Sequence, residues 1–488
     1  MIGIKQLQDG WRRFDDNLNP IVVRELRQSV RGRFTMIALF LFLLLMLLTS
    51  AVVLSSDDIS GTELAEIMFS ILMVVCMMLV PIFFGVRSAL EREREHMELL
   101  FISSLSPQRI VAGKLVAASM VSFLFFSAAA PFLTLTYFLR GIDVLTILMT
   151  MLVLFVVVVF MLQTAVFVGS APTPVYMKIL LGLGYVFFCF AMFGITYAVT
   201  EDLLRSGWGS FYERSLSNRL WLSALVFIAF TGGLFLLTTS LYKNPYHNPA
   251  FAPRLYFFIL SALSLVAGAV WLSTSALEGL VFLVIFIGLV GFTVGICEEE
   301  TPHRQMLAGL PDAWWPRMLL FPFYSGAMPA LVWSFLMVTG ALATFLVRTN
   351  FKLDTSFFEI ALGLVLFTVF YGLSAFYLRR RLWPRFISRH WNWLLGLILC
   401  GFGMFIPWTL GVLFLSGEEL WEHSIVFVLN PFALGRGSHR ELLLGVVGLL
   451  GAGVTALQVP AVLRAIAQFK APPPEQAKAS FPPPRRGR

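Results

Sequence analysis

Long apolar segments recur along the whole chain and alternate with shorter polar ones. Residues 34–54 and 147–169, for example, contain no charged side chain. A helix needs about 20 apolar residues to cross the hydrocarbon core of a bilayer, and its backbone groups must bond within the segment. The pattern therefore predicts twelve transmembrane helices, at residues 34–54, 64–87, 112–138, 144–169, 176–199, 219–241, 254–276, 279–297, 317–347, 356–378, 392–416 and 441–463. The ninth is long, and we expect it to tilt or to break near Pro322 and Pro329.

Composition supports the same class of protein. The chain has 488 residues, of which 58% are hydrophobic and 13% are charged, whereas soluble domains carry roughly 25% charged residues. We predict an all-α, polytopic helical membrane protein with about 12 transmembrane helices. The four cysteines fall in or at the end of predicted spans and do not form the spacing pattern of a disulfide framework.

The positive charges predict the orientation in the membrane. With the N-terminus in the cytoplasm, 28 of the 36 Lys and Arg residues fall in cytoplasmic segments, which are 1–33, 87–114, 169–178, 242–254, 298–317, 379–390 and 464–488. This bias agrees with an even number of spans. The net charge of +8 is accounted for by this topology and by attraction to anionic lipid, so nucleic acid is not an expected partner. The outer loops are expected to be mostly short, and residues 200–219 are expected to form the longest of them.

The segment before the first span predicts an amphipathic helix. It begins at Asn19 and Pro20, a plausible helix start. Its apolar arc at helical spacing is Val22, Val23, Leu26, Val30 and Phe34. The other side is expected to carry Arg24, Glu25, Arg27, Gln28, Arg31 and Arg33. Such a helix lies in the inner surface of the membrane or serves as a topology anchor alone.

Four parts follow along the chain. Residues 1–33 are a cytoplasmic N-terminus with the amphipathic helix, and residues 34–245 are a six-span unit. Residues 246–468 form a second six-span unit, which is either a diverged repeat of the first or an unrelated membrane extension. Residues 469–488 are a Pro-rich, basic tail that is expected to be disordered.

A dense run of charge interrupts the apolar pattern between the second and third spans. Four glutamates and two arginines lie within eight positions: Glu91, Arg92, Glu93, Arg94, Glu95 and Glu98. Opposite charges recur at helical spacing, such as Glu91 with Arg94 and Arg92 with Glu95. Leu99 and Leu100 then begin an apolar patch, and Ser106 with Pro107 can start the next helix. The run predicts a short helical hairpin in the cytoplasm, which is either a docking surface or an ordinary solvated loop.

Motifs of the common enzyme classes are absent from the sequence. Gly113-Lys114 is not part of a P-loop, and neither an HExxH zinc motif nor a GxSxG nucleophile motif occurs. The six histidines are scattered without ligand spacing. The centres of the predicted spans also lack the charged residues that proton-coupled carriers use. We therefore expect no catalytic residues, no bound metal and no cofactor in this chain.

The charged run resembles the first cytoplasmic loop of ABC type-2 transporter permeases. Members of that family carry a glutamate-rich run, a Leu-Glu-Leu-Leu step, a Pro-Leu-Ser-Pro turn, an Ile-Val step and a Gly-Lys pair. The matching residues here, in order, are Glu91, Glu93, Glu98, Leu99, Leu100, Leu105, Ser106, Pro107, Ile110, Val111, Gly113 and Lys114. The helix before the first span is similar to the elbow helix of the family, through Asn19, Pro20, Arg24 and Glu25, and Arg27 and Arg31 continue its basic side. The resemblance covers about residues 15–245 and departs at Glu95-His96, where the family often has Gly-Thr.

The resemblance implies a permease subunit of an ATP-driven exporter in the plasma (inner) membrane of a prokaryote. The loop 88–111 would contact a separate ATP-binding subunit, which the resemblance implies acts as a dimer, and transmit its closure to the spans. A homodimer of the permease is a further expected partner arrangement, and residues 296–318 occupy the place of a second coupling loop. The alternative is a polytopic scaffold or anchor that transports nothing. A membrane enzyme is disfavoured because no polar catalytic cluster is evident.

Overall fold

The computed structural model describes residues 20–55, 60–93, 106–139, 142–215, 219–243, 248–299, 304–307, 310–351, 356–382, 388–414, 430–431 and 440–470. Within these residues every regular element is a helix. Eleven of the helices are long and apolar enough to cross a membrane: Arg33–Val53, Gly61–Arg92, Pro107–Phe138, Val144–Gly169, Val175–Gly209, Phe251–Trp271, Thr274–Gly295, Ala327–Arg348, Ser356–Arg381, Arg389–Pro407 and Leu443–Gln468. The all-α, polytopic membrane class is therefore confirmed.

The span count differs by one from the expected twelve. The sixth expected span, residues 219–241, is helix α10 (Arg219–Leu241). Its apolar part among the described side chains is the shorter stretch Phe227–Leu241, which is why it falls outside the eleven. Each of the twelve expected segments thus contains a helix among its described residues.

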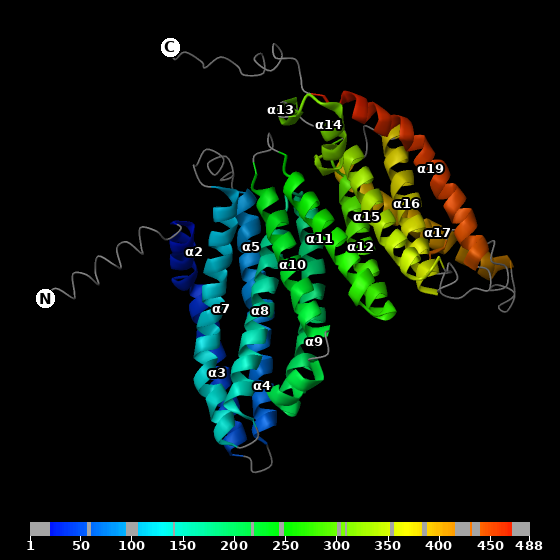
Figure 1. The fold of residues 1–488 in the computed structure, drawn as a ribbon. Coiled ribbons are helices and arrows are strands. Elements are labelled where there is room, and N and C mark those ends of the chain that lie inside the picture. The colour runs from blue at the N-terminus through cyan, green and yellow to red at the C-terminus, as the bar shows by residue number, and fades with distance from the viewer. Residues whose placement is uncertain are drawn as a thin grey trace, which may run out of the picture. The chain divides into compact units, whose positions relative to one another are not determined.

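The chain divides into two compact units, Met1–Lys243 and Asn244–Arg488. Sequence alone placed this border two residues later. The first unit contains α2 (Pro20–Val30), α3 (Arg33–Leu54), α4 (Gly61–Met73), a π-helical turn (Val74–Leu79), α5 (Val80–Glu93), α7 (Pro107–Phe138), α8 (Val144–Gly169), α9 (Val175–Ser215) and α10. Helices α4 and α5 form one continuous span through the π-helical turn (Figure 1). Helix α8 is the hub of this unit because it packs on α5, α7, α9 and α10.

The second unit contains α11 (Phe251–Trp271), α12 (Thr274–Gly295), α13 (Arg304–Leu307), α14 (Trp314–Leu320), a 3-10 turn (Phe321–Phe323), α15 (Ala327–Arg348), α16 (Ser356–Arg381), a second 3-10 turn (Arg389–Trp391), α17 (Asn392–Phe414) and α19 (Arg440–Gln468). Here α16 packs on α12, α15, α17 and α19, and α12 lies along α15.

The expected break in the ninth span is present at Pro322. Helix α14 ends at Leu320, the 3-10 turn contains Pro322, and Gly326 has φ +139°, a backbone conformation that favours glycine. Pro329 does not break the chain. It lies in the first turn of α15, where a missing N–H costs no intrahelical bond.

The prediction of an outer loop at residues 200–219 is wrong for the first part of this segment, which is helical. Helix α9 continues to Ser215, with one kink at Gly207, where φ is +72°. Polar contacts link this extension to neighbouring helices: Arg205 pairs with Glu66 on α4 at 2.9 Å, and the Trp208 N–H donates to Thr146 Oγ1 at 3.0 Å. A helix can extend beyond its apolar segment when neighbouring helices supply such partners.

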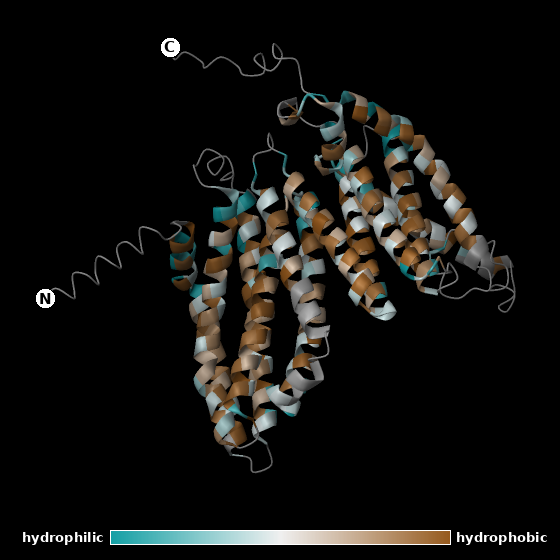
Figure 2. Cartoon of the chain, in the orientation of Figure 1, coloured by the Kyte–Doolittle hydropathy of each residue, from teal (hydrophilic) through white to brown (hydrophobic). Residues whose placement is uncertain are grey.

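The outer surfaces of the helices are apolar, as a lipid environment requires. Figure 2 shows hydrophobic residues along the sides of the helices in both units. On α3, for example, Ile37, Phe40 and Leu41 are all exposed. Contiguous apolar surface on this scale does not occur on soluble monomers, so the packing and the composition give the same answer.

Helices α5 and α8 approach each other closely at two glycines. A Cβ atom added to Gly169 would lie 2.1 Å from the carbonyl oxygen of Gly85, and one added to Gly85 would lie 3.2 Å from the carbonyl oxygen of Ala165. Small residues at such a crossing let two backbones meet, which is a common way to hold membrane helices together.

Replacing Gly169 with alanine should therefore separate α5 from α8. We expect Gly169→Ala to lower the free energy of unfolding by about 2 kcal/mol, the usual cost of overpacking. The measurement is thermal unfolding of the purified protein in detergent. Gly182→Ala on α9 is the matched control, since a Cβ there has no neighbour within 4 Å. Equal losses in both variants would contradict the close approach.

Candidate functional site: charged clusters at the helix ends

Helix α2 has an exposed basic face and a buried face that is not wholly apolar. Arg24 and Arg27 are exposed on one face, and Arg31, directly after the helix, is exposed too, as the sequence predicted. Val22, Glu25 and Ser29 are buried on another, against α7. The expectation that Glu25 lies on the polar outer side is wrong, because Glu25 is only 3% exposed. Apolar spacing alone could not show that a carboxylate on this helix has cations to face.

Glu25 is buried because two cations from other helices meet it. Arg87 on α5 places Nη2 at 2.8 Å from Glu25 Oε2, and Lys114 on α7 places Nζ at 3.9 Å from Glu25 Oε1. Arg87 also donates to Ser29 Oγ at 2.9 Å and to the side chain of Gln28. A buried charge is tolerated only when it has partners of opposite charge, and Glu25 has two.

Glu91 completes the cluster. Its carboxylate accepts a hydrogen bond from the Lys114 ammonium and lies 3.3 Å from Arg87 Nε. Glu25, Arg87, Glu91 and Lys114, called here the first cluster, contain two carboxylates and two cations. Its charge is therefore balanced. The first cluster joins α2, the last turns of α5 and the second turn of α7.

Arg92 bonds to the ends of two further helices. Its Nη1 donates to the backbone carbonyl of Ser170, directly after α8. The same nitrogen donates to the carbonyl of Leu241, the last residue of α10, at a distance of 3.2 Å. Ser170 and Tyr242 are joined by a hydrogen bond between their hydroxyls at 2.7 Å. A cation at helix C-termini satisfies their free carbonyls and opposes the negative end of the dipole. Arg92 thus connects the second span to the fourth and sixth.

Ser106 and Pro107 start helix α7, as the sequence predicted. Ser106 is the N-cap, and its hydroxyl accepts the Arg109 N–H at 3.4 Å, while Pro107 occupies the first helical position. The third span therefore begins at a fixed point on the C-terminal side of the charged run.

The charged run itself is only partly within the described residues. Glu91 and Arg92 point into the unit, so the interpretation of both as part of a projecting charged rim is wrong. Glu93 ends α5, and Pro20 begins α2. The remaining predicted residues lie outside the described residues: Asn19, Arg94, Glu95, Glu98, Leu99 and Leu100. Sequence reasoning missed Arg87 and Ser29. The available signal was that Arg87 lies one helical turn before Glu91.

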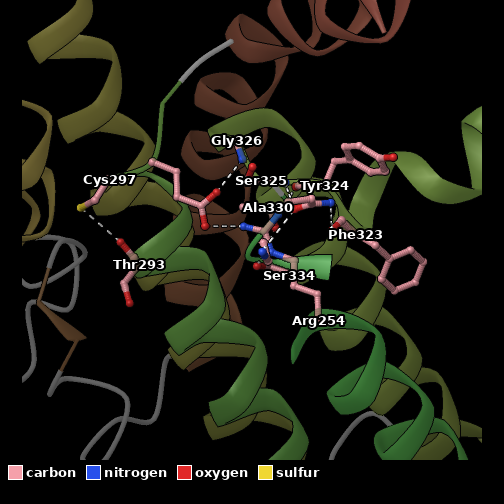
Figure 3. A network of polar contacts seen from close by, with 12 residues as sticks. Arg254, Thr293, Cys297, Phe323, Tyr324, Ser325, Gly326, Ala330 and Ser334 are labelled. Carbon is pink, nitrogen blue, oxygen red and sulfur yellow. Dashed lines mark hydrogen bonds and ion pairs between the residues drawn. The ribbon is translucent and has the colours of Figure 1, made fainter. Parts of the chain in front are cut away.

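The second unit has a polar cluster of its own, drawn in Figure 3. Arg254, in the first turn of α11, lies with Nη2 2.5 Å from Glu298 Oε1, and it donates through Nη1 to the carbonyl of Tyr324. The Arg254 carbonyl accepts the Trp333 indole N–H at 3.0 Å. Arg254 is nearly buried, and all of its described partners lie around the end of α12 and the start of α15.

Glu298 and Asn248 hold the chain where α15 begins. Glu298 Oε2 accepts the Gly326 N–H at 2.5 Å, and Asn248 Oδ1 accepts the Ser325 N–H at 3.1 Å. Carboxylates at a helix N-terminus are stabilising because free N–H groups and the positive end of the dipole face them. Arg254, Glu298 and Asn248, with the backbone of residues 323–326, are called here the second cluster.

The charged side chains of both clusters are engaged with one another and with helix ends. Cys297 is next to Glu298 in the sequence. Burial raises the pKa of its thiol, which donates to the Thr293 carbonyl at 3.5 Å. In the part of the chain that the structure describes, no group of three or more His, Cys, Asp or Glu residues is placed to hold a metal. What the clusters do is fasten helix ends to one another.

No protein family, curated protein or solved structure matches this chain.

The stability that the first cluster gives the protein should depend on its charge balance more than on any single bond. Lys114→Met leaves two carboxylates with one cation, and we expect the free energy of unfolding to fall by about 3 kcal/mol, as when one partner is removed from a buried pair. The double variant Glu91→Gln/Lys114→Met restores neutrality and should recover at least half of that loss. Thermal unfolding in detergent measures both.

The exposed pair between Arg205 and Glu66 supplies the control. Arg205 is 62% exposed, and exposed ion pairs contribute little, so Arg205→Gln should leave the melting temperature unchanged. A double variant less stable than Lys114→Met alone would contradict the account of the first cluster.

Proposed function

We propose that this chain is the membrane permease subunit of an ATP-driven ABC transporter, with export as its direction. The loop 88–111 receives a separate ATP-binding subunit. The observation that carries the proposal is the first cluster, because it fixes both ends of the loop that resembles the ABC type-2 coupling loop. Glu91 lies at the entry of the loop, and Lys114 lies just beyond its exit.

The contacts at both ends of the loop 88–111 suit a segment on which a partner subunit exerts force. The Glu91–Lys114 pair joins the second span to the third, Glu25 adds the helix before the first span, and Arg92 adds the fourth and sixth. Ion pairs shielded from water are stronger than exposed ones. A displacement of the loop would then move several helices together instead of bending one.

In this proposal the chain forms the substrate path and hydrolyses nothing. ATP hydrolysis takes place in the partner subunit, which acts as a dimer, and the assembly lies in the plasma (inner) membrane of a prokaryote. The exposed arginines of α2 face the headgroup region, where anionic lipid attracts them. The second candidate, a polytopic scaffold or anchor, shares the spans and the charges but requires no ATPase.

Co-purification with the ATP-binding protein encoded beside this chain separates the two candidates. The informative variant changes Glu93, Glu95 and Glu98 to alanine and keeps Glu91, because Glu91 belongs to the first cluster. We expect wild type to retain the ATPase and the triple variant to retain no more than half as much.

The matched control changes three glutamates of the predicted outer loop, Glu418, Glu419 and Glu422, to alanine. It removes the same charge and should leave ATPase binding unchanged. Failure of wild type to bind any ATPase would favour the scaffold candidate.

A further inference from the structure

The two units share most of the pairings among their six long helices, although the second helix packs on the fifth, α4 on α9, in the first unit alone among the substantial pairings of the described residues. Counted along the chain, the six helices are α3, α4–α5, α7, α8, α9 and α10 in the first unit and α11, α12, α15, α16, α17 and α19 in the second. In both, the fourth helix packs on the second, third, fifth and sixth, and the third packs on the first, second and sixth. Every substantial pairing of the second unit therefore has a counterpart in the first.

The polar clusters occupy corresponding places in this scheme. Each includes a charged residue six positions after an Asn-Pro pair: Glu25 after Asn19-Pro20, and Arg254 after Asn248-Pro249. Each pairs that residue with an opposite charge near the end of the second helix, Arg87 in the first unit and Glu298 in the second. Each also bonds to the start of the third helix, through Lys114 or through the Gly326 N–H.

The differences between the clusters explain why the sequence shows the likeness only faintly. The signs of the pair are reversed, and the charged residue lies on a separate helix, α2, in the first unit but in the first turn of the span itself in the second. Exchanging the signs of the two charges preserves the ion pair, but the two units then have different amino acids at the corresponding positions. The arrangement therefore persists where the amino acids do not.

We propose that the two units are copies of one six-helix fold and that the second cluster is the counterpart of the first, fixing the helix ends of the second unit where a second ATP-binding subunit docks. One chain then supplies both membrane halves and works as a single copy with two ATPase subunits, not as a homodimer. The identity of the partner rests on the proposed function; the duplication rests on the helix pairings and the clusters.

The duplication has a test that needs no ATPase. Six spans return the chain to its starting side, so the third helix should begin on the same side of the membrane in both units. We would place single cysteines at Gln108 and Asp312, both exposed, in a chain whose four native cysteines are replaced by alanine. Both should react with a membrane-impermeant maleimide only after the cells are opened, whereas Trp271→Cys, at the far end of α11, should react in intact cells. Labelling of Gln108→Cys and Asp312→Cys from opposite sides would overturn the duplication.

Native mass spectrometry of the assembled complex tests the stoichiometry. We expect one permease chain with two ATPase subunits. Two permease chains with two ATPase subunits would overturn the inference and leave the proposed function intact, whereas absence of any ATPase would overturn the proposed function and, with it, the second docking place.

Variants of the two clusters test which cluster supports which ATPase docking place. Arg254→Gln/Glu298→Gln removes the ion pair of the second cluster and keeps it neutral, and Glu25→Gln/Arg87→Gln does the same in the first. Each should lower the bound ATPase from two copies to one while the chain stays monodisperse on size exclusion. Glu66→Gln/Arg205→Gln, which removes an ion pair outside both clusters, should keep two. Two copies bound to the Arg254→Gln/Glu298→Gln variant would overturn the role of the second cluster.

Discussion

Burying charge in a membrane protein is costly unless every charge finds a partner, and this constraint organises the first unit. Glu25 cannot leave water without Arg87 and Lys114, and Lys114 cannot without Glu91. The partners come from three different helices, so neutrality is reached only when α2, α5 and α7 are all in place. The cluster thereby specifies how these helices meet, while close glycine contacts between α5 and α8 and apolar packing within the unit fill the remaining space.

The same constraint gives the cluster its proposed role. A loop that joins two independent helix ends would absorb a push by bending. Here the helix ends on both sides of the loop are bonded to each other and, through Arg92, to the carbonyl ends of α8 and α10. The second unit reaches a similar result with different groups, since the carboxylate of Glu298 holds both an arginine and a helix N-terminus. In both units the fixed point lies between the second and third long helices.

The sequence predicted the spans well because a run of about 20 apolar residues has one stable solution in lipid. It also predicted the start of α7, since Ser106 and Pro107 act locally. It failed for Glu25, because apolar spacing cannot register cations that lie 62 and 89 positions later in the chain. The extension of α9 past residue 200 was missed for a similar reason: Glu66 and Thr146, which contact it, belong to other helices. Pairing across helices is the part of the fold that sequence patterns do not contain.

The central claim is that α2 and the start of α7 move as one body when the partner acts on the loop. Spin labels at Arg24→Cys and Gln108→Cys, both exposed positions, report the distance between these helices by pulsed electron paramagnetic resonance. The account predicts one narrow distance distribution in the complex with its ATPase, unchanged between the nucleotide-free and ATP-bound states. The Glu91→Gln/Lys114→Met variant should broaden it. A shift or a second peak in the wild-type distribution on ATP binding would contradict the claim, because the first cluster would then be opening instead of transmitting the motion.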